Sequence, residues 1–141
     1  MLGSVFISLP VADVAKATAF YAAIGFTRDA AFSGAHASSM KWSDGVSIML
    51  IRHDFYRTLT PKPIADAHAA SAMLIALQLD SRAAVDAMAQ AAVAAGGREV
   101  HGAEDEGFMY SRGFEDPDGN GFGPLWMDPT AATAAQQEDA R

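Results

Sequence analysis

The first part of the chain changes its hydrophobic period twice. Residues 5–11 are rich in β-branched and apolar residues and predict a strand, and Asp13 after them is a residue type that caps helix N-termini. Apolar positions then recur every three or four residues up to Ile24, and Gly25 follows where helices commonly end, so we predict a helix over 13–24. Three short strands are expected after it, at 26–31, 37–42 and 46–52.

Residues 53–72 interrupt this pattern. They contain Pro61 and Pro63 and no sustained apolar period, which is typical of a connector, with room for one helical turn around 64–68. We expect Phe55, Tyr56 and Lys62 of this connector to close over whatever site the rest of the chain forms, because loops on a rigid scaffold often carry binding groups.

The same order of elements returns after the connector. A strand is predicted over 73–79, then a helix that ends at Gly96 and Gly97, then strands over 98–101, 107–115 and 121–127. The acidic run 104–106 is expected to be a solvated loop. The apolar stripe of the second helix consists of Val85, Met88, Ala89, Ala92 and Val93.

The two halves also match residue by residue, although weakly. The first-strand pattern Phe6, Leu9, Val11 followed by an acidic cap corresponds to Leu74, Leu77, Leu79 followed by Asp80 and Ser81, which are predicted to cap the second helix. We therefore predict an α+β fold in which two βαβββ modules, 3–52 and 73–128, form a cup-shaped mixed sheet within one domain, 1–128. The remaining residues, 129–141, predict a flexible C-terminal tail.

Side-chain alternation along the strands predicts what lines the cup. Each sheet has a helix on one face, so we expect the two concave faces to oppose each other and enclose a pocket. Leu9 and Val11 belong under the first helix, as Leu77 and Leu79 belong under the second. The alternate positions, which should face the pocket, are Phe6, Ser8, Leu74 and Ala76.

Composition excludes several classes of protein. The chain has 141 residues, no cysteine and a net charge of -7, which excludes disulfides and thiolate metal sites and argues against a nucleic-acid partner. No run of eighteen apolar residues predicts a membrane helix, and the N-terminus lacks the basic stretch of a signal peptide. We expect a cytoplasmic protein without membrane or nucleic-acid partners.

Two signatures connect this pattern to a known family. They are FY-x-x-x-GF at 20–26 and DPDGN at 116–120, each in the matching half of a βαβββ repeat. With these signatures, the chain resembles the vicinal oxygen chelate superfamily over about residues 3–128. That superfamily includes glyoxalase I, bleomycin-resistance, fosfomycin-resistance and extradiol-dioxygenase proteins. The resemblance implies a cup-shaped site, commonly a homodimer and, in most enzymatic members, one divalent metal. It also places Met109, Ser111 and Leu125 in the cup, with Tyr110 and Phe114 toward the helix.

The metal-ligand positions that the resemblance implies carry no ligands here. In the family, the ligands are usually a histidine in the first strand of a module and a glutamate or glutamine in its last strand. In this sequence the two histidine positions are occupied by Phe6 and Leu74, and the two glutamate or glutamine positions by Met49 and Gly123. None of these side chains offers the imidazole nitrogen or carboxylate oxygen that such metals need. We therefore predict no metal cofactor, and a mainly apolar pocket in which Ser8 and Ser111 supply hydrogen bonds.

These observations favour a binding protein that holds a small, partly apolar molecule in the cup. The alternative is a metal-dependent lyase or isomerase of the lactoylglutathione lyase type, or a dioxygenase-like enzyme, with non-standard groups such as His53 or His36. An interaction module that keeps only the fold is a third reading. Trp126 is expected to pack between the modules or across a dimer, and the connector is long enough for the modules to pair within one chain or between two.

Overall fold

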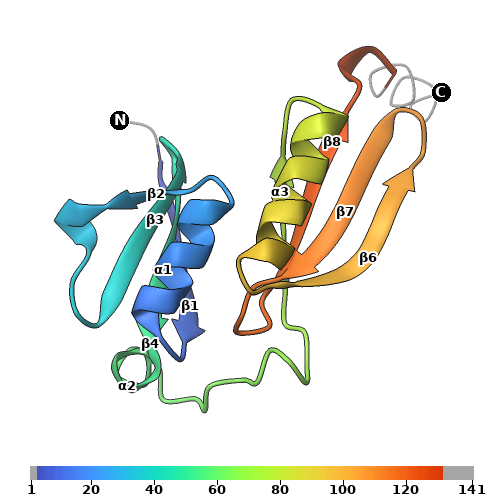
Figure 1. Cartoon of the computed structure of the whole chain (residues 1–141). Coiled ribbons are helices and arrows are strands. Elements are labelled where there is room, and N and C mark those ends of the chain that lie inside the picture. The colour runs from blue at the N-terminus through green and yellow to red at the C-terminus, as the bar shows by residue number, and fades with distance from the viewer. Residues whose placement is uncertain (1–2, 132–141) are drawn as a thin grey trace.

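The computed structural model describes residues 3–131 and shows two modules, each with one helix on a four-stranded sheet (Figure 1). The elements of the first module are β1 (Val5–Val11), α1 (Val14–Ala23), β2 (Thr27–Asp29), the 3₁₀ turn η1 (Ala30–Phe32), β3 (Ala37–Ser43) and β4 (Val46–Arg52). The connector begins with the short helix α2 (His53–Tyr56). The second module contains β5 (Leu74–Gln78), α3 (Arg82–Ala94), β6 (Arg98–Asp105), β7 (Met109–Glu115) and β8 (Gly121–Met127).

The two sheets have the same topology. Their strand orders are β1-β4-β3-β2 and β5-β8-β7-β6, so the first strand of each module lies beside its last strand. Those two neighbours are parallel and the other pairs are antiparallel. The predicted α+β fold of two repeated βαβββ modules is confirmed.

The helix ends follow from the residues that the sequence places there. Asp13 accepts a hydrogen bond from the backbone N–H of Lys16 at 3.0 Å, and Ser81 accepts one from Ala84 at 3.0 Å. Each bond satisfies an N–H group that has no partner within its helix. Both helices are followed by a glycine with positive φ, 111° at Gly25 and 105° at Gly96, a conformation that glycine adopts at little cost.

One hydrophobic core runs through both modules. Phe20 of α1 packs against Phe114 of β7 with ring centroids 6.2 Å apart, and Tyr21 packs against Phe122 of β8 at 5.7 Å. Leu9, Val11 and Leu77 are buried in this core, as the strand alternation predicts. Leu79 is partly buried and packs against it.

A buried polar contact accompanies this apolar junction. The Tyr21 hydroxyl donates to Asp116 Oδ2 at 2.6 Å, and the same carboxylate accepts backbone N–H bonds from Asp118 and Asn120. Burial, and then the negative charge of Asp116, hold the pKa of Tyr21 well above its usual value, so the phenol keeps the proton that it donates. Close by, the Ala12 N–H donates to Asp118 Oδ1 at 3.0 Å. The DPDGN turn of the second module is thereby fastened to α1 of the first.

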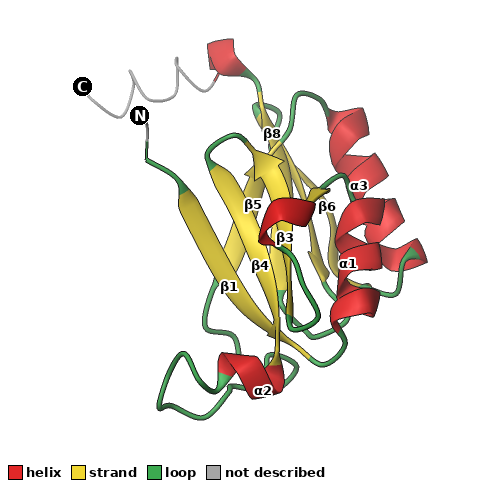
Figure 2. Ribbon diagram, turned by 90° about the vertical axis from the view of Figure 1, so that its left-hand side faces the viewer, coloured by secondary structure: helices red, strands yellow, loops and turns green. Residues whose placement is uncertain are grey.

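The relative placement of the modules differs from one of the two arrangements that the sequence leaves open, the pairing of concave faces within one chain. Both helices lie on one side of the molecule and both sheets on the other, so the concave faces do not oppose each other within the chain (Figure 2). The reason is the helix-side core, since Phe20 and Tyr21 join the modules through the faces that carry the helices. Consequently Phe6 is 56% exposed and Leu74 is 78% exposed.

Smaller corrections concern element ends. The strand predicted at 26–31 is cut short because Asp29 caps η1 through the Ala31 N–H. The connector begins with a short helix, α2, that the sequence did not predict, and the turn expected around 64–68 lies at 66–70, where the Asp66 carbonyl oxygen accepts from the backbone N–H groups of Ala69 and Ala70 at 3.0 Å. Strand β6 runs on to Asp105, so two residues of the acidic run belong to a strand. Val93 of the expected apolar stripe is 48% exposed.

Two further expectations concern the chain as a whole. Most of the predicted tail, residues 132–141, lies outside the described residues. Within 3–131, no helix has the length and apolar character needed to cross a membrane.

Candidate ligand-binding site

A cavity of about 700 Å³, hereafter the main cavity, lies on the concave face of the second sheet. The connector and the end of β1 form its remaining walls. A cavity of this size is in the range that holds small organic ligands. The residues predicted for the cup that do line this cavity are Ser8, Leu74, Ala76, Met109, Ser111, Gly123 and Leu125.

Phe6 and Met49 do not line this cavity. In the register of β1 and β4, Phe6 pairs with Ser47 and Ser8 pairs with Met49, so both residues lie on the concave face of the first sheet. That face opens beside the second sheet instead of opposite it, which is why the cavity does not reach these two positions (Figure 2). Within the chain, Phe6 and Met49 therefore lie apart from the other predicted lining residues, and their place in a ligand pocket stays a prediction.

Glycines form part of the cavity floor. A Cβ atom added at Gly121 would lie 2.7 Å from Leu74 Cδ2, and one added at Gly113 would collide with the His101 ring. At Gly123 the nearest heavy atom would be the Arg112 carbonyl oxygen, 3.8 Å away. The floor is thus open at Gly123, while side chains from neighbouring strands cover the other two glycines.

The connector closes one side of the cavity. Tyr56 and Lys62 line it, as the sequence predicts, but Phe55 instead stacks on His36 at a centroid distance of 5.7 Å. The connector is held against the second module at Gly119, where an added Cβ would lie 2.7 Å from the backbone nitrogen of His68. Gly119 also has a φ of 92°, so this close approach depends on glycine.

Polar side chains also line parts of this cavity. Ser8 and Ser111 supply hydroxyl groups, and His101 covers Gly113 with its Nδ1 2.9 Å from the Gly102 carbonyl oxygen. Glu115, 16% exposed at its side chain, is paired with Arg98 at 2.8 Å. His101 was missed from the sequence, because its place opposite Gly113 depends on irregular pairing between β6 and β7.

A second cleft of about 310 Å³ lies on the other side of connector residues 64–67. His53, Arg57, His68 and Asp118 line it, so His53 does not belong to the main cavity. Burial, followed by repulsion from Asp116, raises the pKa of Asp118, while the Ala12 N–H and the two histidines act in the opposite direction.

The residues at the family's metal positions do not fit a divalent metal. Phe6 and Met49 belong to the first sheet and Leu74 and Gly123 to the second, and none of these side chains is an oxygen or nitrogen donor. Nor does any group of three or more histidine, aspartate and glutamate side chains within residues 3–131 suit a metal ion. The absence of a metal cofactor stays a prediction.

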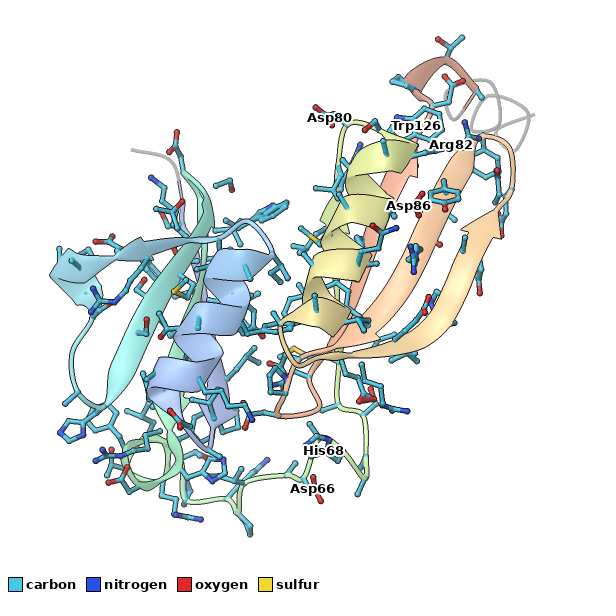
Figure 3. All side chains as sticks on the ribbon, in the orientation of Figure 1. Asp66, His68, Asp80, Arg82, Asp86 and Trp126 are labelled. Atoms are coloured by element: carbon cyan, nitrogen blue, oxygen red, sulfur yellow. The ribbon has the colours of Figure 1, made fainter. Side chains whose placement is uncertain are left out.

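The helix side of the second module carries a polar network away from the cavity. Arg82 lies over the Trp126 ring, 4.6 Å from its centroid (Figure 3), so Trp126 packs within its own module and not between the two modules. The Tyr110 hydroxyl donates to Asp86 at 2.6 Å, which lowers the pKa of Asp86. Arg112 pairs with the same carboxylate at 3.1 Å. The expected helix-side orientation of Tyr110 is confirmed.

Comparison with known proteins agrees with this geometry. The model of the Glyoxalase/Bleomycin resistance protein/Dioxygenase superfamily matches residues 3–123. The chain belongs to this superfamily. Among solved structures, the chain is similar to that of hypothetical protein SA1046 from S. aureus, with a TM-score of 0.76 and 22% identity over 89% of this chain and 94% of that one.

Two other solved structures share the superfamily fold. A glyoxalase/bleomycin resistance protein/dioxygenase family enzyme from Burkholderia phytofirmans PsJN has a TM-score of 0.74 and 18% identity, covering 86% of this chain and 96% of that one. A bleomycin resistance determinant encoded on the transposon Tn5 has a TM-score of 0.61 and 20% identity, covering 90% and 99%. A search of curated proteins found no significant match. At these identities the similarity supports the fold and leaves the ligand open.

Proposed function

We propose that this superfamily member is a metal-independent binding protein that holds a small, partly apolar molecule in the cavity of the second module. The observation that carries the proposal is the 700 Å³ cavity with an open floor at Gly123 and lining residues such as Leu74, Met109 and Leu125. Burial of apolar ligand surface there would supply most of the affinity, and Ser8 or Ser111 would orient the ligand.

Occluding the cavity tests this proposal. In Gly123→Leu the new side chain enters space in which no atom other than the Arg112 carbonyl lies within 4 Å of its Cβ, so the fold should tolerate it. We expect it to lower the affinity for the neutral fluorescent probe N-phenyl-1-naphthylamine at least ten-fold. The matched control is Gly34→Leu, because a Cβ at Gly34 also meets nothing within 4 Å and Gly34 does not line the cavity. Equal probe affinity in both variants would refute the proposed binding site.

Metal content per protomer separates this proposal from the metal-dependent alternative. We expect untagged protein, purified without chelators and then offered nickel, zinc, manganese and iron, to retain less than stoichiometric metal by elemental mass spectrometry. Tight stoichiometric metal would favour a lyase, isomerase or dioxygenase with ligands other than Phe6, Met49, Leu74 and Gly123.

We also propose a homodimer. The concave face of the first sheet presents Phe6, which is 56% exposed, and an apolar group in such a position is commonly covered by association. Superfamily membership supports a second copy as the partner.

A further inference from the structure

The charges around the main cavity differ from the charge of the whole chain. The net charge of the chain is -7, but two of the three charged residues that line the cavity are basic. The three are Lys62, Arg112 and Glu115. Ion pairing decides which of these charges a ligand would meet, because a paired charge has little remaining attraction for another ion.

Two of the three charges are already compensated. The Arg112 guanidinium lies on the helix side, 3.1 Å from Asp86 and 2.9 Å from Glu99. The Glu115 carboxylate is 2.8 Å from the Arg98 guanidinium. These contacts leave neither an available cation nor an available anion on the sheet itself.

Lys62 is different. Within residues 3–131, no carboxylate oxygen lies within ion-pair distance of its ammonium group, and its backbone N–H donates to Thr60 Oγ1 at 3.3 Å. His101, which also lines the cavity, adds no further free charge, because its Nδ1 lies 3.8 Å from Glu104 Oε1. The uncompensated charge of the cavity wall is therefore positive.

We infer that the cavity prefers apolar molecules that carry a negative group, with the apolar body over Gly123 and the anionic group at Lys62. This inference rests on the proposed function and adds the charge class of the ligand. It runs against the expectation from net charge alone, by which an acidic protein would favour a cation.

Two probes with the same ring system test the inference. 8-Anilinonaphthalene-1-sulfonate differs from N-phenyl-1-naphthylamine by its sulfonate, so each variant is titrated with both by fluorescence. We expect Lys62→Met to lower the affinity for the sulfonate probe about five- to ten-fold and to change the affinity for the neutral probe less than two-fold. Lys62→Arg should keep the affinity for the sulfonate probe. Lys16→Met is the control, because Lys16 lies on α1, has no ion pair among the described residues and does not line the cavity.

The outcomes separate the inference from the proposed function. If Lys62→Met leaves the affinity for the sulfonate probe unchanged while Gly123→Leu lowers the affinity for both probes, the inferred charge preference is wrong and the proposed binding site is supported. If Gly123→Leu affects neither probe, the binding site itself is wrong. Should Gly123→Leu fail to fold, Ala76→Met serves instead, since Ala76 pairs with Gly123 across β5 and β8 and lines the same cavity.

Discussion

The two modules use equivalent helix positions but different residues on their concave faces. On the helix side, α1 buries Ala17, Phe20 and Tyr21. The corresponding positions of α3 are Val85, Met88 and Ala89, which are also buried. Equivalent positions of the two helices are thus buried in the core. The aromatic residues of α1 also contact the second module, whereas the residues of α3 at these positions form no ring contacts of this kind.

The concave faces differ more. Beside β1, the floor positions of β4 are Ser47 and Met49, whereas beside β5 the equivalent positions of β8 are Gly121 and Gly123. Only the second face is closed by the connector to form the 700 Å³ cavity. The same βαβββ unit therefore provides a filled surface or a ligand-sized space, depending on side-chain volume at two strand positions and on what crosses the sheet.

The largest effect is expected where the modules are fastened together. Asp116→Ala should lower the free energy of unfolding by about 3–5 kcal/mol, because it leaves the buried Tyr21 hydroxyl and the partly buried backbone N–H groups of Asp118 and Asn120 without their acceptor. The control is Asp44→Ala in the turn of the first module, whose exposed ion pair with Lys41 should be worth less than about 1 kcal/mol. Urea denaturation measures both, and equal losses would contradict the unequal roles of the two turns.

Tyr21→Phe should have the next largest effect. Removing the hydroxyl deletes one buried bond to a carboxylate and should cost about 1.5–3 kcal/mol. Tyr110→Phe is the comparison, since its hydroxyl makes a bond of the same length to the more exposed Asp86 and should cost less. A larger loss at Tyr110 than at Tyr21 would mean that the modules are not held together by the Tyr21 contact.

The exposed first face provides a test of association. Phe6→Ser should raise the dissociation constant of the proposed homodimer at least ten-fold, whereas Phe32→Ser, which removes another exposed phenylalanine of the same module, should leave it within two-fold. Sedimentation over a range of protein concentrations measures the constant. A monomer at all concentrations, or equal effects of the two substitutions, would remove the homodimer from the proposal.

The smallest effect concerns Asp118. Because its pKa is raised in the folded protein, the ionised carboxyl lowers stability at pH values above the raised pKa, and this cost disappears as the pH falls below the usual aspartate range. Asp118→Asn keeps an acceptor for the Ala12 N–H and should raise the free energy of unfolding at pH 7 by less than about 1 kcal/mol. Denaturation at pH 7 and near pH 3 checks the sign, and a gain that grows toward acid pH would contradict it.

The sequence by itself determined the elements and their repetition. Strand alternation identified Leu9 and Val11 as helix-side residues, and Asp13, Ser81, Gly25 and Gly96 marked the helix ends, because these signals act through neighbours along the chain. Most of the predicted lining, such as Ala76, Ser111 and Gly123, also followed from strand periodicity together with the family resemblance.

Only the tertiary structure decided how the modules sit against each other. The contacts of Tyr21 with Asp116 and Phe122 place the sheets side by side, which removes Phe6 and Met49 from the cavity and brings the connector into its wall. Irregular pairing of β6 with β7 places His101 over Gly113. These features join residues far apart in the chain, and periodicity specifies the face on which a side chain lies but not the partner that the face meets.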